Sequence, residues 1–269
     1  MKLISDFFVQ LLSTVGIVAL FGLLIALLRR AFCAVFKTHG SKILLATGIV
    51  GTPIHELSHA LMCIIFGHKI TAIKLYDPKA KDGSLGYVSH KFDKRNLYHK
   101  IGNLFIGTAP VVIGGGIIIA LMFFLIPDAF HTVIGEATEL AAVDITAIPL
   151  SEYFSYISAS LAAIFSGDAL TSWQGILFIL LAIMIATHME LSRADIKNSF
   201  SGFIFLALLL LVLDGVIYLL FPEFLPVITS ATVSFGLMLT AFLSISLVFL
   251  LALLILGIVI KGLISIFKK

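Results

Sequence analysis

Long apolar runs restrict most strongly how this chain can fold. They lie at about 8–28, 43–66, 102–126, 174–188, 201–221 and 234–260. A helix of about 20 apolar residues crosses the hydrocarbon core of a bilayer, and the runs lack the strict alternation of barrel strands. Only 12% of the residues are charged, against about 25% in soluble proteins. We therefore expect an all-α polytopic membrane protein with about six transmembrane helices, organised as a single transmembrane domain over residues 1–269.

Basic residues indicate which ends of these helices face the cytoplasm. Lys and Arg crowd the segment 67–100, whereas the segment 127–173 contains neither and carries several Asp and Glu residues. Because cytoplasmic loops are enriched in Lys and Arg, we expect 67–100 inside and 127–173 outside, in the cytoplasmic membrane of a prokaryote. The basic segment 29–42 would then lie outside, so either the first helix is not a simple span or this loop is an exception. The net charge of +3 is small and spread over loops, so it bears on orientation and not on nucleic-acid binding.

A small cytoplasmic β-hairpin is expected at 68–92. Side chains alternate as in a strand from Ile70 to Leu75, Lys81-Asp82-Gly83 is a turn signal, and 85–90 is suited to a return strand. The free edge of such a hairpin could pair with an extended substrate by strand addition. An ordinary basic loop near anionic lipid is the simpler alternative.

Three other segments have a predicted role in packing. The third span opens with small residues over 103–116, which favours close packing against the second span; Asn103 there either packs or orients a substrate backbone. Segments 129–134 and 154–161 are expected to form surface-lying amphipathic helices. Cys33 and Cys63 are too few for a disulfide framework, so we expect free thiols.

The second apolar run contains the pattern His-Glu-x-x-His, formed by His55, Glu56 and His59. Histidines four residues apart share one face of a helix and can bind one ion, as in zinc metalloproteases. Glu56 can act as a general base on water without being a ligand. Structural packing of three polar residues is the alternative, but ionisable groups at membrane depth are costly and usually functional. We therefore predict a zinc site with His55 and His59 as ligands and Glu56 as the catalytic residue.

Catalytic zinc usually has three protein ligands, and two aspartates compete for the third position. The fourth run covers only about 22 Å if helical, so the polar segment after His188 starts within the membrane and leads to Asp195. Asp214 lies roughly 20 Å deep on the fifth span, above the histidines. Depth therefore favours Asp195, although Ser192 and Asp195 also match a helix capping box, and Asp214 could instead be a buried, hydrogen-bonded carboxylate. His188 and Glu190 are candidates for orienting ligands or binding substrate.

The residues of these segments resemble the site-2 protease family of intramembrane zinc metalloproteases. The resemblance covers the His-Glu-x-x-His helix, the hairpin region at about 68–92, the span after it and a later span leading to an aspartate. It implies a zinc helix running toward the cytoplasm and an aspartate ligand at the position of Asp195. The Asn, Pro and Leu-Asp-Gly signature of that family is missing around Asp195, while a bare Leu-Asp-Gly stands at 213–215. The chain would therefore be a divergent member.

The expected function is that of an integral, multi-pass membrane enzyme, a zinc metallopeptidase. It would use Zn²⁺ to hydrolyse peptide bonds of membrane-embedded protein or peptide substrates, with Glu56 activating water. Its partners would be that substrate and the lipid bilayer, and no nucleic acid. Two other classes stay open: a catalytically silent membrane scaffold or chaperone of the same fold, and a metal or proton transporter. An intact Glu56 favours the enzyme, since binding alone needs no base, and the paired broken spans of many transporters are not evident.

Overall fold

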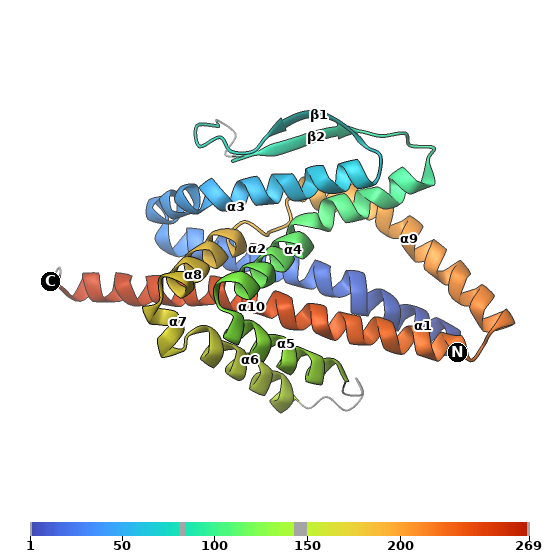
Figure 1. The fold of residues 1–269 in the computed structure, drawn as a ribbon. Coiled ribbons are helices and arrows are strands. Elements are labelled where there is room, and N and C mark those ends of the chain that lie inside the picture. The colour runs from blue at the N-terminus through green and yellow to red at the C-terminus, as the bar shows by residue number, and fades with distance from the viewer. Residues whose placement is uncertain (1, 81–83, 143–149, 268–269) are drawn as a thin grey trace.

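Helices dominate the computed structural model of the chain, which describes residues 2–80, 84–142 and 150–267. Within these residues, five helices are long and apolar enough to cross a membrane (Figure 1): Lys2–Phe36, Thr38–Ile65, Leu97–Leu125, Arg193–Leu220 and Phe224–Leu263. The helical, membrane-type fold predicted from the sequence is confirmed at this level. The elements in chain order are α1 (Lys2–Leu11), a π-helical turn (Leu12–Gly16), α2 (Ile17–Phe36), α3 (Thr38–Ile65), β1 (Lys69–Lys74), β2 (Tyr87–Lys91), α4 (Leu97–Leu125), α5 (Pro127–Ala142), α6 (Leu150–Ile164), α7 (Gly167–Thr171), α8 (Trp173–Ala186), α9 (Arg193–Leu220) and α10 (Phe224–Phe267).

The expected span at 174–188 differs from the other five. It corresponds to α8, which has only 14 residues and ends at Ala186. The chain then runs without helix or strand to Ser192, and α9 begins at Arg193, eight residues before the expected start at 201. Ser192 caps α9, so the helix includes a polar first turn that hydropathy alone assigns to a loop.

The basic segment 29–42 is helical, not a loop. Arg29 and Arg30 lie in α2, Lys42 lies in α3, and Lys37 alone joins the two helices. Its φ of 49° makes Lys37 the one non-glycine residue with positive φ in the described part of the chain. The first span is therefore longer than expected and turns sharply into the helix that carries His55 and His59.

The predicted β-hairpin is present and lies along α3 (Figure 1). Strands β1 and β2 are antiparallel, with Ile70 opposite His90 and Ile73 opposite Val88. The register shifts between Ile70 and Ala72, which leaves Thr71 as an extra residue that bulges β1. The predicted turn at 81–83 falls outside the described residues. At the far end of β1, the Tyr76 hydroxyl donates a 2.6 Å hydrogen bond to the Leu45 carbonyl and holds the hairpin against α3.

The apolar core is formed mainly by α2, α4, α8 and α10, through side chains such as Ile25, Ile118, Phe178 and Phe249, all almost fully buried. Helices α5 and α6, expected to lie on the surface, pack against α10. Val133 on α5 and Tyr156 on α6 are buried, with 0% and 1% exposure. Each of these two helices therefore contributes one face to the packed structure.

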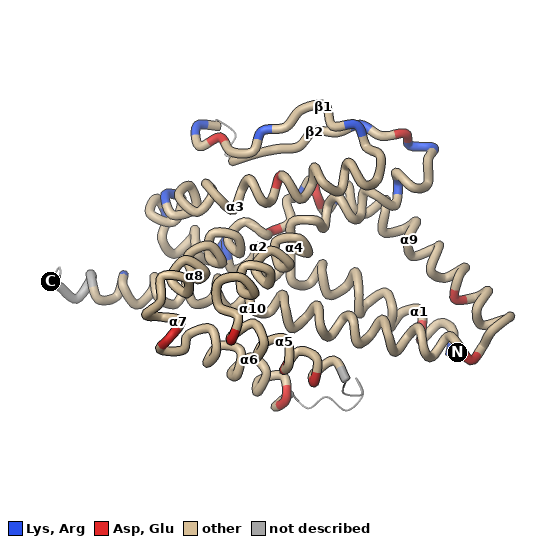
Figure 2. The backbone as a smooth tube through the Cα atoms, in the orientation of Figure 1, with Lys and Arg blue, Asp and Glu red and all other residues tan. Residues whose placement is uncertain are grey.

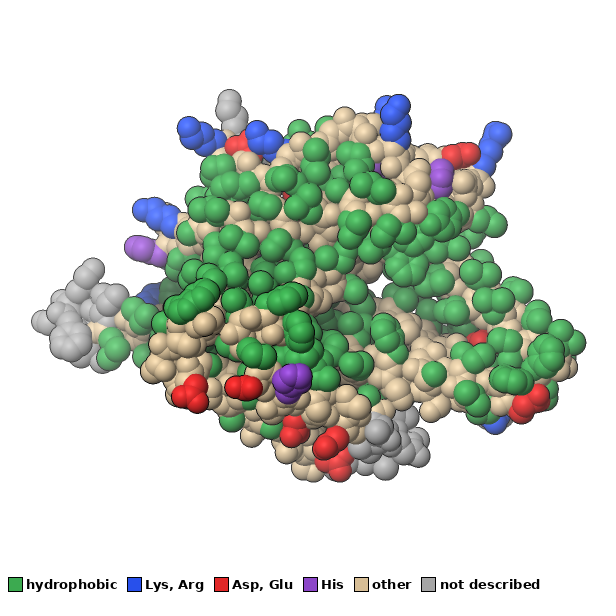
Figure 3. Space-filling view, viewed as in Figure 1, with side chains coloured by type: hydrophobic (Ala, Val, Ile, Leu, Met, Phe, Trp, Pro, Cys, Tyr) green, Lys and Arg blue, Asp and Glu red, His purple; other side chains and the backbone are tan. Residues whose placement is uncertain are grey.

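Charge is segregated between two opposite edges of the molecule. Lys and Arg gather along the hairpin and the neighbouring helix ends, while Asp and Glu gather on α5 to α7 (Figure 2). Hydrophobic side chains cover much of the face between these edges (Figure 3). An apolar band between two charged edges is the arrangement that a bilayer selects.

Candidate metal centre

Two histidine rings meet on one face of α3. His55 and His59 are one helical turn apart, and their Nε2 atoms lie 3.1 Å from each other. His59 is 6% exposed, and Glu56 between them is equally buried. The four-residue spacing predicted this meeting, because residues i and i+4 lie above one another on a helix.

Backbone carbonyls fix the tautomer of both rings. His55 Nδ1 lies 2.7 Å from the His188 carbonyl oxygen, and His59 Nδ1 lies 2.7 Å from the Ile106 carbonyl oxygen. A carbonyl can only accept a hydrogen bond, so each Nδ1 carries the proton and each neutral ring leaves Nε2 as a lone pair. Two lone pairs facing each other at 3.1 Å repel unless a cation, either a proton or a metal ion, lies between them.

Asp195 completes this group of side chains. One ligand atom from each of His55, His59 and Asp195 lies within 4.8 Å of the others, and Asp195 Oδ1 is 3.4 Å from His59 Nε2. The same aspartate forms the predicted capping box, because its Oδ2 accepts a 2.8 Å hydrogen bond from the Ser192 amide. The two alternatives for Asp195 are therefore compatible. The cap orients the carboxylate so that its second oxygen faces the histidines.

Glu56 lines a small polar cavity instead of joining the three converging side chains. The cavity has a volume of about 180 Å³, and its walls come from α2, α3, the hairpin and the segment between α8 and α9. Gly86, which precedes β2, forms part of the wall: a Cβ there would lie 2.8 Å from Glu56 Cγ and 2.9 Å from Thr52 Cγ2. Only glycine lets the hairpin approach Glu56 this closely.

The other sequence candidates lie in different surroundings. Asp214 accepts a 3.3 Å hydrogen bond from Gln10, which also donates to Thr229, so it belongs to a contact among α1, α9 and α10. It lies outside the group formed by the two histidines and Asp195. Asn103 is buried and donates to Ser201 Oγ at 3.2 Å, which joins α4 to α9. The packing alternative for Asn103 fits this contact.

His188 and Glu190 both lie at the candidate centre, in the segment between α8 and α9. His188 contributes its carbonyl oxygen to His55, while its ring lies 3.0 Å from the Thr47 hydroxyl. Glu190 forms an ion pair with Arg29 at the wall of the cavity. Arg29 and the Ile106 carbonyl were not predicted from the sequence as part of the site. Arg29 was visible as a cation at the end of an apolar run, whereas a backbone carbonyl leaves no signal in residue type.

The donor set fits zinc. Two neutral imidazoles and one carboxylate are a common protein ligand set for a catalytic zinc ion. The Nδ1–H of each ring donates a hydrogen bond to a backbone carbonyl, as the second ring nitrogen of a metal-binding histidine usually does. Comparisons with protein-family models, curated proteins and solved structures find no match.

Proposed function

We propose that this chain is a membrane-embedded zinc metallopeptidase that hydrolyses peptide bonds of membrane-embedded substrates. The observation that carries the proposal is the pair of Nε2 lone pairs at 3.1 Å, each imposed by a carbonyl on the opposite side of its ring. With the Asp195 carboxylate beside them, this arrangement calls for a cation. His55, His59 and Asp195 would hold zinc.

Glu56 is the residue suited to proton transfer. A bound zinc ion supplies Lewis acidity toward water and toward a carbonyl group. Glu56 lies next to His55 in the chain, lines the cavity and is not part of the group formed by His55, His59 and Asp195. From there it can take a proton from a water molecule, hold it, and pass it to the amine that leaves when the peptide bond breaks.

The polar cavity gives the reaction a place for water. Arg29 and Glu190 form an ion pair in its wall, and Thr52 and Ser192 add hydroxyl groups. Irregular backbone such as the segment 187–192 is tolerated at membrane depth when it is buried in protein or lines a wet cavity. The polar cavity and the irregular segment beside it therefore favour hydrolysis over simple binding at this point of the fold.

The hairpin is suited to present an extended substrate. A two-stranded sheet leaves unpaired backbone groups on its outer edges, to which a peptide can add as a further strand. Gly86 brings the start of β2 against Glu56, so a strand added near that point would pass close to the cavity. The basic edge in Figure 2 supports a cytoplasmic position for the hairpin and a multi-pass orientation in the cytoplasmic membrane of a prokaryote.

Cleavage in proteoliposomes tests the proposal. Purified protein is reconstituted with a mixture of membrane-spanning peptides, and mass spectrometry locates any cut. We expect cuts within or at the edge of the apolar segments by the wild-type chain, and none by the His55→Ala/His59→Ala double variant. Zinc-loaded wild-type protein that binds these peptides and leaves them intact would point to a scaffold instead.

A further inference from the structure

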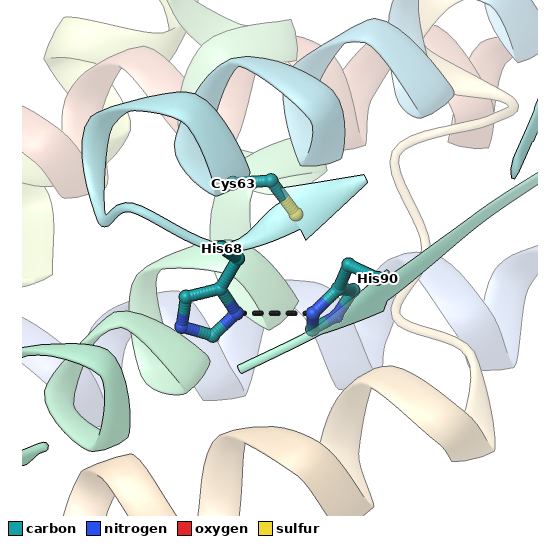
Figure 4. Close-up of side chains that lie close together, drawn as sticks. All are labelled: Cys63, His68 and His90. Carbon is teal, nitrogen blue, oxygen red and sulfur yellow. Dashed lines mark hydrogen bonds between the residues drawn. The ribbon is translucent and has the colours of Figure 1, made fainter. Parts of the chain in front are cut away.

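We propose that Cys63, His68 and His90 form a second metal site, which binds zinc and fastens the base of the hairpin to the end of α3. Cys63 lies on α3, His68 on the loop between α3 and β1, and His90 on β2, and the three side chains lie close together (Figure 4). One ligand atom from each lies within 4.8 Å of the other two. This site is separate from the group formed by His55, His59 and Asp195, and the proposal stands whether or not that first group is catalytic.

The end of α3 brings Cys63 and His68 together. Gly67 has a φ of 69°, and the His68 amide donates to the Cys63 carbonyl at 2.8 Å while the Gly67 amide donates to the Ile64 carbonyl at 3.2 Å. These two bonds define a Schellman motif, which reverses the chain at the end of a helix. His68 therefore returns over the last turn, where Cys63 is 0% exposed.

The hairpin register supplies the third side chain. His90 lies opposite Ile70, near the start of β1. The ring of Phe92 stacks on His68 with centroids 4.8 Å apart and an interplanar angle of 15°. This stacking holds the His68 ring on the side that faces His90, and the two Nδ1 atoms lie 3.0 Å apart.

The tautomer of His68 leaves the facing nitrogen free to bind a metal. Its Nε2 lies 2.9 Å from the His99 carbonyl oxygen, so Nε2 donates and Nδ1 is a lone pair when the ring is neutral. A direct hydrogen bond between the two rings is the alternative explanation for the 3.0 Å distance between the Nδ1 atoms. It assigns no role to the nearby thiol of Cys63.

One sulfur and two imidazole nitrogens select the class of ion. Thiolate and imidazole donors suit zinc and copper, whereas magnesium and calcium prefer oxygen. The place of the site suggests a structural role. Tyr76 holds the far end of the hairpin to α3 through the Leu45 carbonyl, and a metal ion at Cys63 would hold the near end. Both attachments together would keep Gly86 against Glu56.

Cobalt substitution of the full-length protein tests the second site. The first group contains no sulfur, so a thiolate-to-cobalt(II) charge-transfer band in the near ultraviolet reports on a cysteine ligand and not on the first group. We expect the band in wild-type protein, its loss in Cys63→Ser and in His90→Gln, and its retention in the His55→Ala/His59→Ala variant. Cys33→Ser is the matched control, because Cys33 is the other free thiol and lies on α2.

Metal counting provides the second readout. Elemental analysis of zinc-loaded protein should show about one ion fewer per chain in Cys63→Ser and in His90→Gln than in Cys33→Ser. If Cys63→Ser gives no folded protein, the wild-type cobalt spectrum and His90→Gln decide the question. Absence of the charge-transfer band from cobalt-loaded wild-type protein, or its persistence in His90→Gln, would overturn the proposal and leave a hydrogen-bonded histidine pair.

Discussion

Asp195 directs one carboxylate oxygen to the amide of Ser192 and the other toward His59, whose Nε2 lies 3.4 Å away. A helix cap and a candidate metal ligand are thus the same side chain. The cap stabilises the start of α9 and, by fixing the rotation of the carboxylate, sets the direction of the second oxygen. The first residues of α9 therefore link the stability of that helix to the proposed metal centre.

Comparing Asp195→Ala with Ser192→Ala separates the helix-capping role of Asp195 from its proposed role as a metal ligand. Asp195→Ala should lose one bound zinc ion per chain, because only two protein ligands remain at the first site. Ser192→Ala is the matched control: it weakens the same cap at a cost of about 1 kcal/mol and should keep the zinc. Asp214→Ala should also keep it, since Asp214 contacts Gln10 and not the histidines. Zinc stoichiometry at equal folded yield decides, and loss in Asp214→Ala with retention in Asp195→Ala would transfer the ligand role to Asp214.

Glu56→Gln should stop cleavage and leave the zinc content unchanged. Glutamine keeps the shape of the side chain but cannot accept and return a proton, and a positioned acid or base contributes about 10² to 10⁴ in rate. Elemental analysis and a peptide-cleavage assay on the same preparation provide the measurement. A variant that loses zinc would show that Glu56 is a ligand.

Gly86→Val should lower cleavage while the zinc remains bound. The added side chain would meet Glu56 and Thr52 at less than 3 Å, so either the hairpin or the carboxylate must move. Gly116→Val is the control, because a Cβ at Gly116 meets no atom within 4 Å. Cleavage by Gly86→Val at the wild-type rate would mean that the position of the hairpin does not matter for the reaction.

Alkaline pH should weaken the packing of α6 against α10. The Tyr156 hydroxyl donates a 2.7 Å hydrogen bond to the Ala241 carbonyl, and burial raises the pKa of Tyr156 above its usual value of about 10. A raised pKa means that the folded chain keeps the proton when the unfolded chain releases it. The stabilisation is therefore complete below about pH 10 and is lost as the pH rises beyond that value.

Tyr156→Phe tests this linkage. The variant should be about 1 kcal/mol less stable near neutral pH, because one hydrogen bond is lost, and its stability should fall less steeply at alkaline pH. Thermal unfolding in detergent measures both effects. Tyr218→Phe on α9, where Tyr218 is 45% exposed, is the control and should match the wild type. If the stability of Tyr156→Phe falls as steeply with rising pH as that of the wild type, groups other than Tyr156 cause the loss.

Side-chain patterns predicted those parts of the molecule that depend on residue type. The hairpin followed from alternation around Ile73, and the meeting of His55 and His59 followed from helical spacing. Asp195 was favoured because the short fourth run ends inside the membrane, and the structure places it beside His59. In each case the physical signal is carried by the side chains themselves.

Features that depend on the backbone were missed. The carbonyls of Ile106 and His188 orient the two rings, but a carbonyl is present at every position and gives no pattern. The segment around Lys37 was predicted to be a loop, because basic residues between two apolar runs are typical of loops. The backbone is in fact helical on both sides of Lys37. Hydropathy alone placed the start of the fifth span at 201, whereas the predicted capping box at Ser192 indicated the earlier start that α9 has.

Helix α3 contributes residues to both proposed sites, His55 and His59 to one and Cys63 to the other, and this makes the chain sensitive to a change in its length. His55, His59 and Cys63 follow at steps of four residues, each rotated by only about 40° from the one before. A single residue inserted between His59 and Cys63 would turn everything beyond it by about 100°. Substitutions along that turn can be absorbed one at a time, but an insertion or deletion would disconnect the hairpin from the histidine pair in one step. We therefore expect the spacing in this turn to be less tolerant of change than its composition.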